Sequence, residues 1–257
     1  MGRLTGTTAF VTGGARGIGR AIVGKFVAEG AAVTFADRDD GPGRQTAEEL
    51  AAAGTPASFV RADVTSEDDV LRAIGGVLSR HGRLDVLVNN AGINAYFDAT
   101  AMTEAEWDQV FAVDLKGAWL CAKHALPPMQ AARHGSIVNI ASIHATLTIP
   151  GMFPYAAAKA GLLGLTRSLA LEYGPFGIRA NAVSPGYTRT RLVDEWMARQ
   201  ADPEETERRT LLNHPLRRIA TPADIANIVA FLASDEAAAI TGANIAADCG
   251  LGVMFVS

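Results

Sequence analysis

Short apolar segments alternate with longer amphipathic ones along the first third of the chain. The apolar segments are rich in β-branched residues and occupy residues 7–12, 31–37, 57–63 and 84–90. Helical spacing of apolar residues follows the first three of them, at 17–30, 44–54 and 66–82. Strands that alternate with helices form βαβ units, in which helices cover both faces of a parallel sheet. The pattern therefore predicts a doubly wound α/β domain.

The same alternation continues to the end of the chain. Strands are expected at 135–142, 178–185 and 243–247, and helices at 154–173 and 222–233. Seven strands then share one sheet, and no linker, low-complexity stretch or repeat divides residues 1–257, so we expect a single domain. The polar, charged segment 190–219 interrupts the alternation. We expect it to be a mobile flap with one or two helices, beside an active site.

Composition narrows the class of protein. Hydrophobic residues make up 49% and charged residues 19%, so the chain can bury an ordinary globular core. The net charge of -4 provides no basic surface for a polyanion, and we expect no nucleic-acid partner. The amino terminus lacks the apolar core of a signal peptide, and no stretch is long enough to span a bilayer. We therefore expect no membrane association and a cytoplasmic location.

The two cysteines carry no recognisable chemistry. Cys121 and Cys249 have neither metal-binding nor disulfide spacing. Free cysteine is commonly buried, and two free thiols are typical of a reducing compartment. We interpret both as core residues and predict no metal site.

Residues 12–19 join the first predicted strand to the first predicted helix. Glycines at such a junction let the backbone turn tightly and approach a pyrophosphate at the amino terminus of the helix. The place of this string between a strand and a helix, more than the string itself, predicts a dinucleotide site. The expected contacts come from Gly13, Arg16, Gly17, Ile18 and Gly19.

Asp37 ends the second predicted strand. A carboxylate at this place accepts hydrogen bonds from both adenosine ribose hydroxyls and repels a 2′-phosphate, which favours NAD over NADP. Arg16 and Arg38 favour NADP instead, because each could pair with that phosphate. A cap at the end of the strand is the alternative role for Asp37. We predict NAD as the cofactor and keep NADP as the alternative.

Tyr155 and Lys159 lie four residues apart at the start of the helix that Pro154 opens, so both project from one face. An adjacent ammonium and the positive ring of an oxidised nicotinamide both favour the phenolate, which can take a proton from an alcohol. Ser142, at the end of a predicted strand, can hold the substrate oxygen near the phenol. These residues predict hydride transfer between a nicotinamide cofactor and an alcohol or carbonyl carbon.

The chain resembles the classical short-chain dehydrogenases/reductases along nearly its whole length. The resemblance rests on the glycine-rich stretch ending at Gly19 and on Asp63-Val64, Asn89-Asn90-Ala91-Gly92, Ser142, Tyr155-xxx-Lys159 and Pro185-Gly186. It implies a Rossmann fold of about seven parallel strands, in which Tyr155 and Lys159 also contact the cofactor. It further implies a homotetramer in which long helices beginning near Glu104 and Pro154 form one interface.

The same resemblance assigns further cofactor contacts. It implies that Asp63 and Val64 flank the adenine. Asn90, Ala91 and Gly92 are expected to line the cofactor, and together with Asn89 to brace the central sheet. Thr188 and Thr190 are expected beside the nicotinamide carboxamide, and Pro185 and Gly186 are also expected to contact the cofactor. A polar turn at the end of a strand is the alternative role for Asn89-Asn90.

Two positions depart from the family pattern. Asp114 stands where the family usually has an asparagine that helps to connect the catalytic lysine to solvent through water. An ionised carboxylate accepts hydrogen bonds and cannot donate them, so this relay is expected to differ. We include Asp114 in the candidate catalytic set, and a carboxylate that caps a bend in the helix is the alternative. Cys249 stands where a glycine is usual.

The substrate pocket is expected to form from side chains in loops and in the flap next to this chemistry. The candidates are His144, Leu147, Phe153, Tyr187 and Trp196. Their mixture of aromatic and polar groups favours a sugar, a polyol or another small secondary alcohol. His144, two residues after Ser142, could bond a hydroxyl-rich substrate, and an ordinary loop histidine is the alternative.

Three rival functions remain open at this point. A 3-oxoacyl-thioester reductase would suit NADP, and Asp37 opposes it. A non-catalytic NAD-binding sensor would not need the intact set Ser142, Tyr155 and Lys159. A nucleotide-sugar or methyl-donor enzyme can share the sheet and the glycine-rich turn, but methyl transfer has no role for the Tyr-xxx-Lys pair.

Overall fold

The computed structural model describes residues 2–254 and contains one parallel sheet of seven strands, in the order β3-β2-β1-β4-β5-β6-β7. The strands are β1 (Thr8–Thr12), β2 (Ala32–Asp37), β3 (Ser58–Arg61), β4 (Val86–Asn89), β5 (Gly135–Ile140), β6 (Ile178–Pro185) and β7 (Asn244–Ala247). Every predicted strand is present, and the predicted doubly wound Rossmann fold is confirmed. Chain order reverses between β1 and β4, which is where ligands bind in sheets of this kind.

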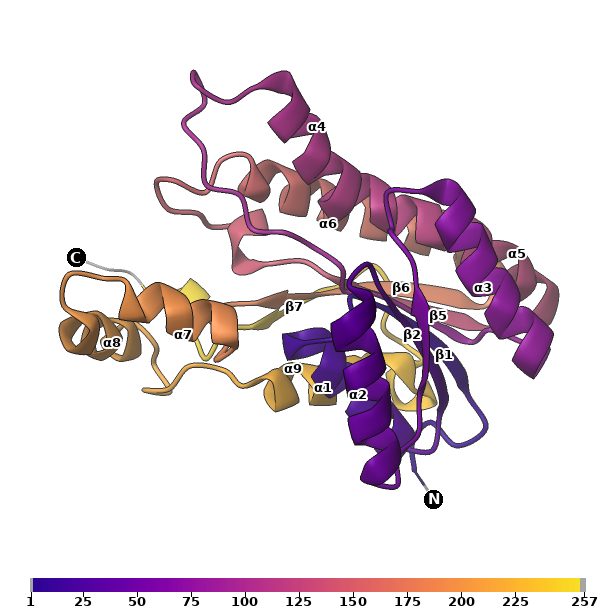
Figure 1. Ribbon diagram of the computed structural model, residues 1–257. Coiled ribbons are helices and arrows are strands. Elements are labelled where there is room, and N and C mark those ends of the chain that lie inside the picture. Colours follow the sequence, from indigo (N-terminus) through magenta and orange to yellow (C-terminus); the bar gives the residue numbers. More distant parts are fainter. Residues whose placement is uncertain (1, 255–257) are drawn as a thin grey trace.

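Helices cover both faces of the sheet (Figure 1). They are α1 (Gly17–Ala28), α2 (Asp40–Ala52), α3 (Glu67–His81), α4 (Glu104–Phe111), α5 (Gly117–Ala132), α6 (Tyr155–Tyr173), α7 (Arg191–Ala198), α8 (Pro203–Leu212) and α9 (Pro222–Ala233). One face carries α1, α2 and α9, and the other carries α3, α4, α5 and α6. A π-helical segment, η1 (Ala112–Lys116), separates α4 from α5, so the helix that begins at Glu104 is not regular throughout.

Two apolar cores lie on opposite faces of the sheet. Successive side chains of a strand point to opposite faces. Val11 therefore packs with α1 and α9, whereas its neighbour Phe10 packs with α3 and α5, and both are almost completely buried. Because both faces are covered, the strands read as continuous apolar runs, which explains why the sequence revealed them.

The ends of several helices are set by local sequence. The Ser66 side chain accepts a hydrogen bond from Asp69 N at the start of α3, and Gly82 ends that helix with a φ of 71°. Pro222 opens α9 behind a capping box in which the Thr221 and Asp224 side chains accept hydrogen bonds from each other's backbone N–H. These are the signals expected at helix ends, and the predicted ranges 66–82 and 222–233 agree closely with the structure.

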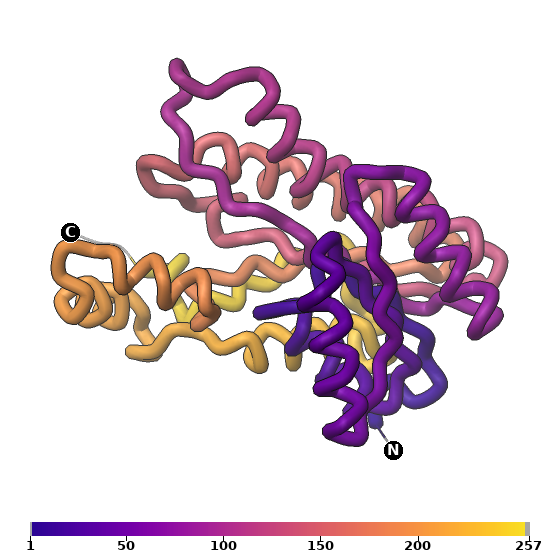
Figure 2. The backbone as a smooth tube through the Cα atoms, in the orientation of Figure 1, coloured from indigo at the N-terminus to yellow at the C-terminus, as the bar shows by residue number. Residues whose placement is uncertain are grey.

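The predicted flap forms two helices, α7 and α8, beyond the carboxyl end of β6 (Figure 1). The segment that follows β7 returns beside the end of the flap (Figure 2), where Leu216 N donates to Cys249 O over 3.2 Å. Among residues 2–254, no helix has both the length and the apolar character needed to cross a bilayer.

Candidate active site

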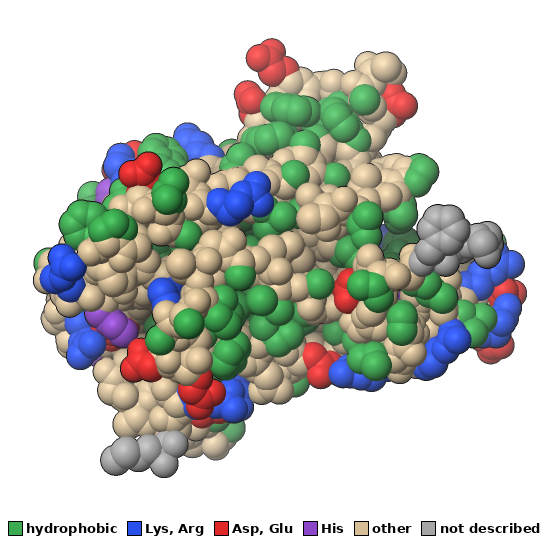
Figure 3. Space-filling view, turned by 180° about the vertical axis from the view of Figure 1, so that it is seen from behind, with side chains coloured by type: hydrophobic (Ala, Val, Ile, Leu, Met, Phe, Trp, Pro, Cys, Tyr) green, Lys and Arg blue, Asp and Glu red, His purple; other side chains and the backbone are tan. Residues whose placement is uncertain are grey.

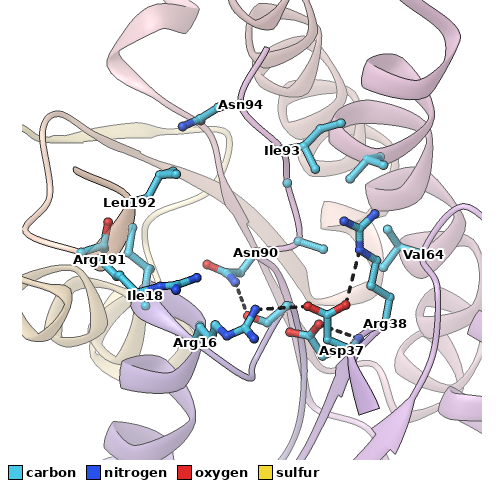
Figure 4. A pocket seen from close by; sticks show the side chains of 18 of the residues that line it. Arg16, Ile18, Asp37, Arg38, Val64, Asn90, Ile93, Asn94, Arg191 and Leu192 are labelled. Carbon is cyan, nitrogen blue, oxygen red and sulfur yellow. Dashed lines mark hydrogen bonds and ion pairs between the residues drawn. The ribbon is translucent and has the colours of Figure 1, made fainter. Parts of the chain in front are cut away.

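A cleft of about 720 Å³ opens near the carboxyl ends of β1, β2 and β4. Figure 4 looks into this cleft and shows side chains from several elements converging on it. Most of the predicted cofactor residues line it: Gly13, Arg16, Gly17, Ile18, Gly19, Asp37, Arg38, Asp63, Val64, Asn90, Ala91, Gly92 and Thr190. The structure thus brings together residues that the sequence separates by up to 177 positions, counted from Gly13 to Thr190 (190 minus 13).

Glycines at the first βα junction allow close backbone contacts that a Cβ atom would block. Gly13 has a φ of 65°, and a Cβ atom there would lie 2.9 Å from Ala91 Cα. A Cβ atom on Gly19 would lie 2.1 Å from Gly13 O. Asn90 Nδ2 donates to Thr12 O and Gly13 O over 3.0 and 2.9 Å, which joins the ends of β1 and β4. This tight, glycine-rich turn at the start of α1 fits the pyrophosphate of a dinucleotide.

Asp37 stands at the end of β2 and faces the cleft. Its Oδ2 accepts a hydrogen bond from Ala15 N over 3.2 Å, and its Oδ1 accepts one from Asp39 N over 3.1 Å. These bonds agree with the capping role for Asp37. They do not exclude contact with a ribose, because each carboxylate oxygen has a second lone pair with which to accept a hydroxyl.

Arg16 and Arg38 both lie beside a carboxylate that the sequence did not single out. Arg16 Nη1 lies 3.1 Å from Asp39 Oδ2, and Arg38 Nε lies 3.9 Å from Asp39 Oδ1. Asp39 itself lines the cleft, and its backbone N–H is held by Asp37. This end of the cleft therefore carries two carboxylates and two guanidinium groups, and their formal charges balance.

The wall of the cleft at Asp63 and Val64 is braced by the start of α3. Asp63 N donates to Asp69 Oδ2 over 3.0 Å, and Asp63 Oδ1 accepts from Thr65 N over 2.8 Å. Val64 packs against Gly117 at the start of α5, where a Cβ atom would lie 2.8 Å from Val64 Cγ2. Both predicted adenine contacts are thus held at the wall of the cleft.

Tyr155 and Lys159 occupy the first turns of α6, as predicted. Lys159 is 4% exposed, and its Nζ lies 5.5 Å from the centre of the Tyr155 ring. The ammonium donates to Ile140 O, at the end of β5, over 3.2 Å. A Cβ atom on Gly92 would lie 3.1 Å from Lys159 Nζ. Because Gly92 lines the cleft, this contact places the Lys159 ammonium next to it.

Ser142 follows β5 and is 6% exposed. Its Oγ accepts a hydrogen bond from His144 N over 3.2 Å, in the short 3-10 helix η2 (Ile143–Ala145). The His144 ring lies edge-on to the Tyr155 ring, with 6.1 Å between their centres. His144 therefore connects the serine loop to the start of α6, and Ser142, Tyr155 and Lys159 belong to adjoining elements.

Asp114 lies in η1 with no exposed side-chain surface. Its Oδ1 accepts from Ile93 N over 2.8 Å, and its Oδ2 lies 3.4 Å from Lys159 Nζ. Burial raises the pKa of Asp114, while the Lys159 ammonium and the Ile93 N–H act against that rise. Among the described residues, the carboxylate makes no hydrogen bond to its own helix. The geometry favours contact with Lys159 over a capping role.

Two aromatic residues that were predicted for the substrate pocket, Tyr187 and Trp196, lie together. The Tyr187 ring lies 5.7 Å from the Trp196 ring and 6.0 Å from His214, measured between centres. Burial raises the pKa of Tyr187 and of Tyr96, and the nearby Tyr155 and Tyr187 phenols raise the pKa of Tyr96 further. The phenols of Tyr96 and Tyr187 therefore remain neutral near pH 7.

His144 is also neutral near pH 7, because burial lowers its pKa. Its Nδ1 is enclosed, and among the described residues no partner binds it. Protonation of the ring would add an N–H at this enclosed nitrogen, where it would have no acceptor among the described residues. This agrees with the lowered pKa.

Several predicted residues lie elsewhere. Phe153 packs against Trp107 of α4, with 5.7 Å between ring centres, and not with Tyr187 and Trp196. Five predicted cofactor residues are not among those that line the 720 Å³ cleft: Tyr155, Lys159, Pro185, Gly186 and Thr188. Thr188 is buried and donates to Gly186 O over 3.3 Å.

The sequence reasoning missed residues on both sides of the cleft. Asn94 and Tyr96 follow the Asn-Asn-Ala-Gly stretch and line the cleft, as does Asp39. The fully buried His214 packs on Tyr187, and its Nδ1 lies 2.6 Å from Thr210 O. A sequence signal existed for Asp39, two residues beyond Asp37, and for Asn94 and Tyr96, two and four residues beyond Gly92, because Asp37 and Gly92 are predicted cofactor residues.

Comparison with known proteins agrees with this architecture. A family model described as Enoyl-(Acyl carrier protein) reductase matches residues 13–252. The chain is 40% identical over 250 residues to 2-(S)-hydroxypropyl-CoM dehydrogenase 3 of Xanthobacter autotrophicus, which covers 97% of this chain and 98% of the relative. The chain belongs to the short-chain dehydrogenase/reductase family. As a member of that family it is an oxidoreductase that acts on alcohol or carbonyl groups of a small molecule and binds a nicotinamide cofactor.

Other members of the short-chain dehydrogenase/reductase family resemble this chain to a similar degree. 3-Oxoacyl-[acyl-carrier-protein] reductase FabG of Staphylococcus aureus is 40% identical over 246 residues, which covers 95% of this chain and 97% of the relative. The solved structure of Thermoplasma acidophilum aldohexose dehydrogenase superposes with a TM-score of 0.90 at 36% identity, and covers 99% of this chain and 97% of its own. These relatives act on different substrates according to their names, so family membership alone leaves the substrate open.

Proposed function

We propose that this chain is an NAD-dependent dehydrogenase that oxidises a secondary hydroxyl of a small, neutral, hydroxylated molecule such as a sugar or polyol. One observation carries the proposal: the buried Lys159 ammonium lies 5.5 Å from the centre of the Tyr155 ring and next to Gly92, which lines the same cleft as the glycine-rich turn. This arrangement joins an acid/base side chain to a cofactor site.

The residues present divide the chemistry among them. A bound nicotinamide dinucleotide would supply the hydride acceptor. Tyr155 acts as a phenolate that the nearby Lys159 ammonium stabilises, and it takes the proton from the substrate hydroxyl to become a neutral phenol. Ser142 donates a hydrogen bond to the reacting oxygen and so holds it near the phenol. Asp114 and Ile140 O hold Lys159 in place.

The substrate class is inferred from the polar and aromatic side chains near Tyr155 and at the start of the flap. Tyr96, Tyr187 and the neutral His144 offer hydrogen bonds without charge, and Trp196 adds an apolar surface. Hydroxyl groups combined with apolar C–H faces match such a lining, whereas a charged substrate gains little from it. A structural relative that is by name an aldohexose dehydrogenase supports this assignment.

NAD is favoured as the cofactor by Asp37, whose carboxylate stands where the adenosine ribose of a bound dinucleotide would lie in a sheet of this kind. A 3-oxoacyl-thioester reductase is the second candidate, because FabG is among the relatives. Such an enzyme would more naturally use NADP, and Asp37 opposes a 2′-phosphate.

We also propose that the protein is a cytoplasmic homotetramer. The outer surface of α4, α5 and α6 exposes large apolar side chains, namely Trp107, Trp119 and Leu171. Figure 3 shows hydrophobic side chains exposed on the upper part of the molecule, the region of α4 in Figure 1. A second copy of the chain is the proposed cover for this surface. The two free cysteines fit a reducing cytoplasm.

The experiment that tests the function is a screen for NADH formation. Sugars, polyols, hydroxy acids, steroid alcohols and 3-hydroxyacyl thioesters are each incubated with NAD and then with NADP. Turnover of a sugar or polyol with NAD supports the proposal. Turnover confined to thioesters with NADP would establish the reductase alternative, and no turnover of any alcohol would favour a sensor.

A further inference from the structure

The end of the cleft beside Asp37 contains residues that favour NAD and residues that favour NADP. Asp37 is the residue type that binds a free ribose, whereas Arg16 and Arg38 are the residue type that binds a 2′-phosphate. All three line the same cleft, and Figure 4 shows both arginines converging beside Asp37. A dinucleotide bound there would meet both signals, so a further residue must decide between them.

Asp39 is the residue that distinguishes the two arrangements. One oxygen of its carboxylate faces each arginine, at 3.1 Å from Arg16 Nη1 and 3.9 Å from Arg38 Nε. Its position is fixed from behind, because Asp39 N donates to Asp37 Oδ1 over 3.1 Å. Asp39 precedes α2 but makes no side-chain hydrogen bond that caps the helix. Its carboxylate thus pairs with the two arginines and does not cap α2.

The charges at this place determine what a 2′-phosphate would meet. Such a phosphate carries a charge of roughly -1.5 to -2 at neutral pH. Two aspartates and two arginines sum to zero, so the phosphate gains no net attraction and must displace Asp39 from both guanidinium groups. All three side chains are about half exposed, and an exposed ion pair changes an equilibrium by only about fivefold. The preference for NAD is therefore a modest one that a single charge can move.

We propose that Asp39 is a second cofactor-selecting residue, which holds Arg16 and Arg38 away from a 2′-phosphate and so excludes NADP. The inference rests on the proposed NAD dependence. Replacement of the Asp39 carboxylate by an amide leaves Asp37 in place for the ribose, releases both arginines and gives the end of the cleft a net charge of +1. The 2′-phosphate of NADP can then pair with the released arginines, while the groups that bind NAD are unchanged.

The test is fluorescence titration of NADH and NADPH against wild type, Asp39→Asn and a matched control. The control is Asp40→Asn, which removes a neighbouring carboxylate that pairs with Arg44 over 2.7 Å and does not line the cleft. We expect Asp39→Asn to tighten NADPH binding by about 5 to 25-fold, the range from one released ion pair to two, and to leave NADH binding within about threefold. Asp40→Asn should change neither.

A second variant shows whether the arginines are responsible. In Asp39→Asn combined with Arg16→Gln and Arg38→Gln, the gain in NADPH affinity should disappear. Unchanged NADPH affinity in Asp39→Asn, or a gain in affinity that persists without the arginines, would overturn the inference. The proposed function would still stand in either case if wild type binds NADH. Wild type that binds NADPH more tightly than NADH would contradict both, and thermal midpoints of all variants show that each is folded.

Discussion

Asp114 Oδ2 lies 3.4 Å from Lys159 Nζ, and both side chains are almost completely enclosed. A buried carboxylate next to the candidate catalytic lysine has a direct route to influence activity, whereas an asparagine would bring no charge. Burial raises the pKa of Asp114 despite the attraction of the ammonium. A carboxyl whose pKa is higher in the folded state stabilises the fold below its unfolded pKa, and that stability is lost as the pH rises through the folded value.

Asp114→Asn should therefore raise the thermal midpoint at neutral pH by a few °C, the shift expected for roughly 1 kcal/mol in a domain of this size. The difference from wild type should shrink as the pH is lowered toward 4, where Asp114 itself becomes neutral. Calorimetry across this pH range measures it. A variant that is less stable than wild type at neutral pH would show that the attraction to Lys159 outweighs burial.

The same position should separate catalysis from stability. Asp114→Asn should preserve or modestly raise kcat, because the amide keeps the bond from Ile93 N and adds a donor. Asp114→Ala should lower kcat by about 10 to 100-fold. In both variants the alkaline limb of the rate profile should move to lower pH, because the ammonium loses its counter-charge. A limb that stays in place in both variants would remove Asp114 from the proton path.

Asp37→Ala should weaken NAD and increase the use of NADP. The substitution removes a ribose acceptor and a negative charge while Arg16 and Arg38 remain. It also removes the acceptor for Ala15 N, so NAD binding should suffer more than in Asp39→Asn. Values of kcat/KM for both cofactors give the preference, and a ratio that does not move would place cofactor selection elsewhere.

His144→Leu should affect substrates with a second hydroxyl more than simple secondary alcohols. A neutral imidazole can make one hydrogen bond to such a hydroxyl, and loss of a neutral hydrogen bond weakens binding by about 3 to 10-fold. KM for a sugar or polyol should rise by this factor, with kcat for a simple alcohol nearly unchanged. Equal effects on both substrates would assign His144 to the support of Tyr155 and Ser142.

Leu171→Glu should break a subunit interface if α6 contributes to one. This side chain is 78% exposed and lies near the end of α6. A buried, unpaired carboxylate at an interface is strongly unfavourable. Leu71→Glu on α3, at 52% exposure, is the matched control. Sedimentation should show smaller particles for Leu171→Glu only, and a monomeric wild type would refute the tetramer.

The sequence was sufficient to predict the strands and the central chemistry, for physical reasons. Strands covered on both faces are apolar throughout, and a pair four residues apart on a helix must share a face, which located Tyr155 and Lys159. The glycine-rich turn was recognisable because its role depends on a backbone conformation that glycine adopts readily and other residues do not.

The remainder depends on contacts between distant segments. The π-helical segment at 112–116 adds one residue to a turn, too small a change to alter the apolar spacing. Asp39 gains its partner Arg16 only when α1 and α2 are placed side by side. Phe153 was expected in the substrate pocket, and its ring packs against Trp107 of α4, a contact that the sequence spacing does not indicate.

The most direct test of the central claim is Tyr155→Phe, measured for NADH binding and for NAD-dependent oxidation of the best substrate. The ring still packs beside Lys159, so NADH affinity should stay within about twofold, while loss of the acid/base group should reduce kcat by about 100-fold or more. A variant that binds NADH normally and retains more than about a tenth of wild-type kcat would contradict the assignment of Tyr155 as the acid/base.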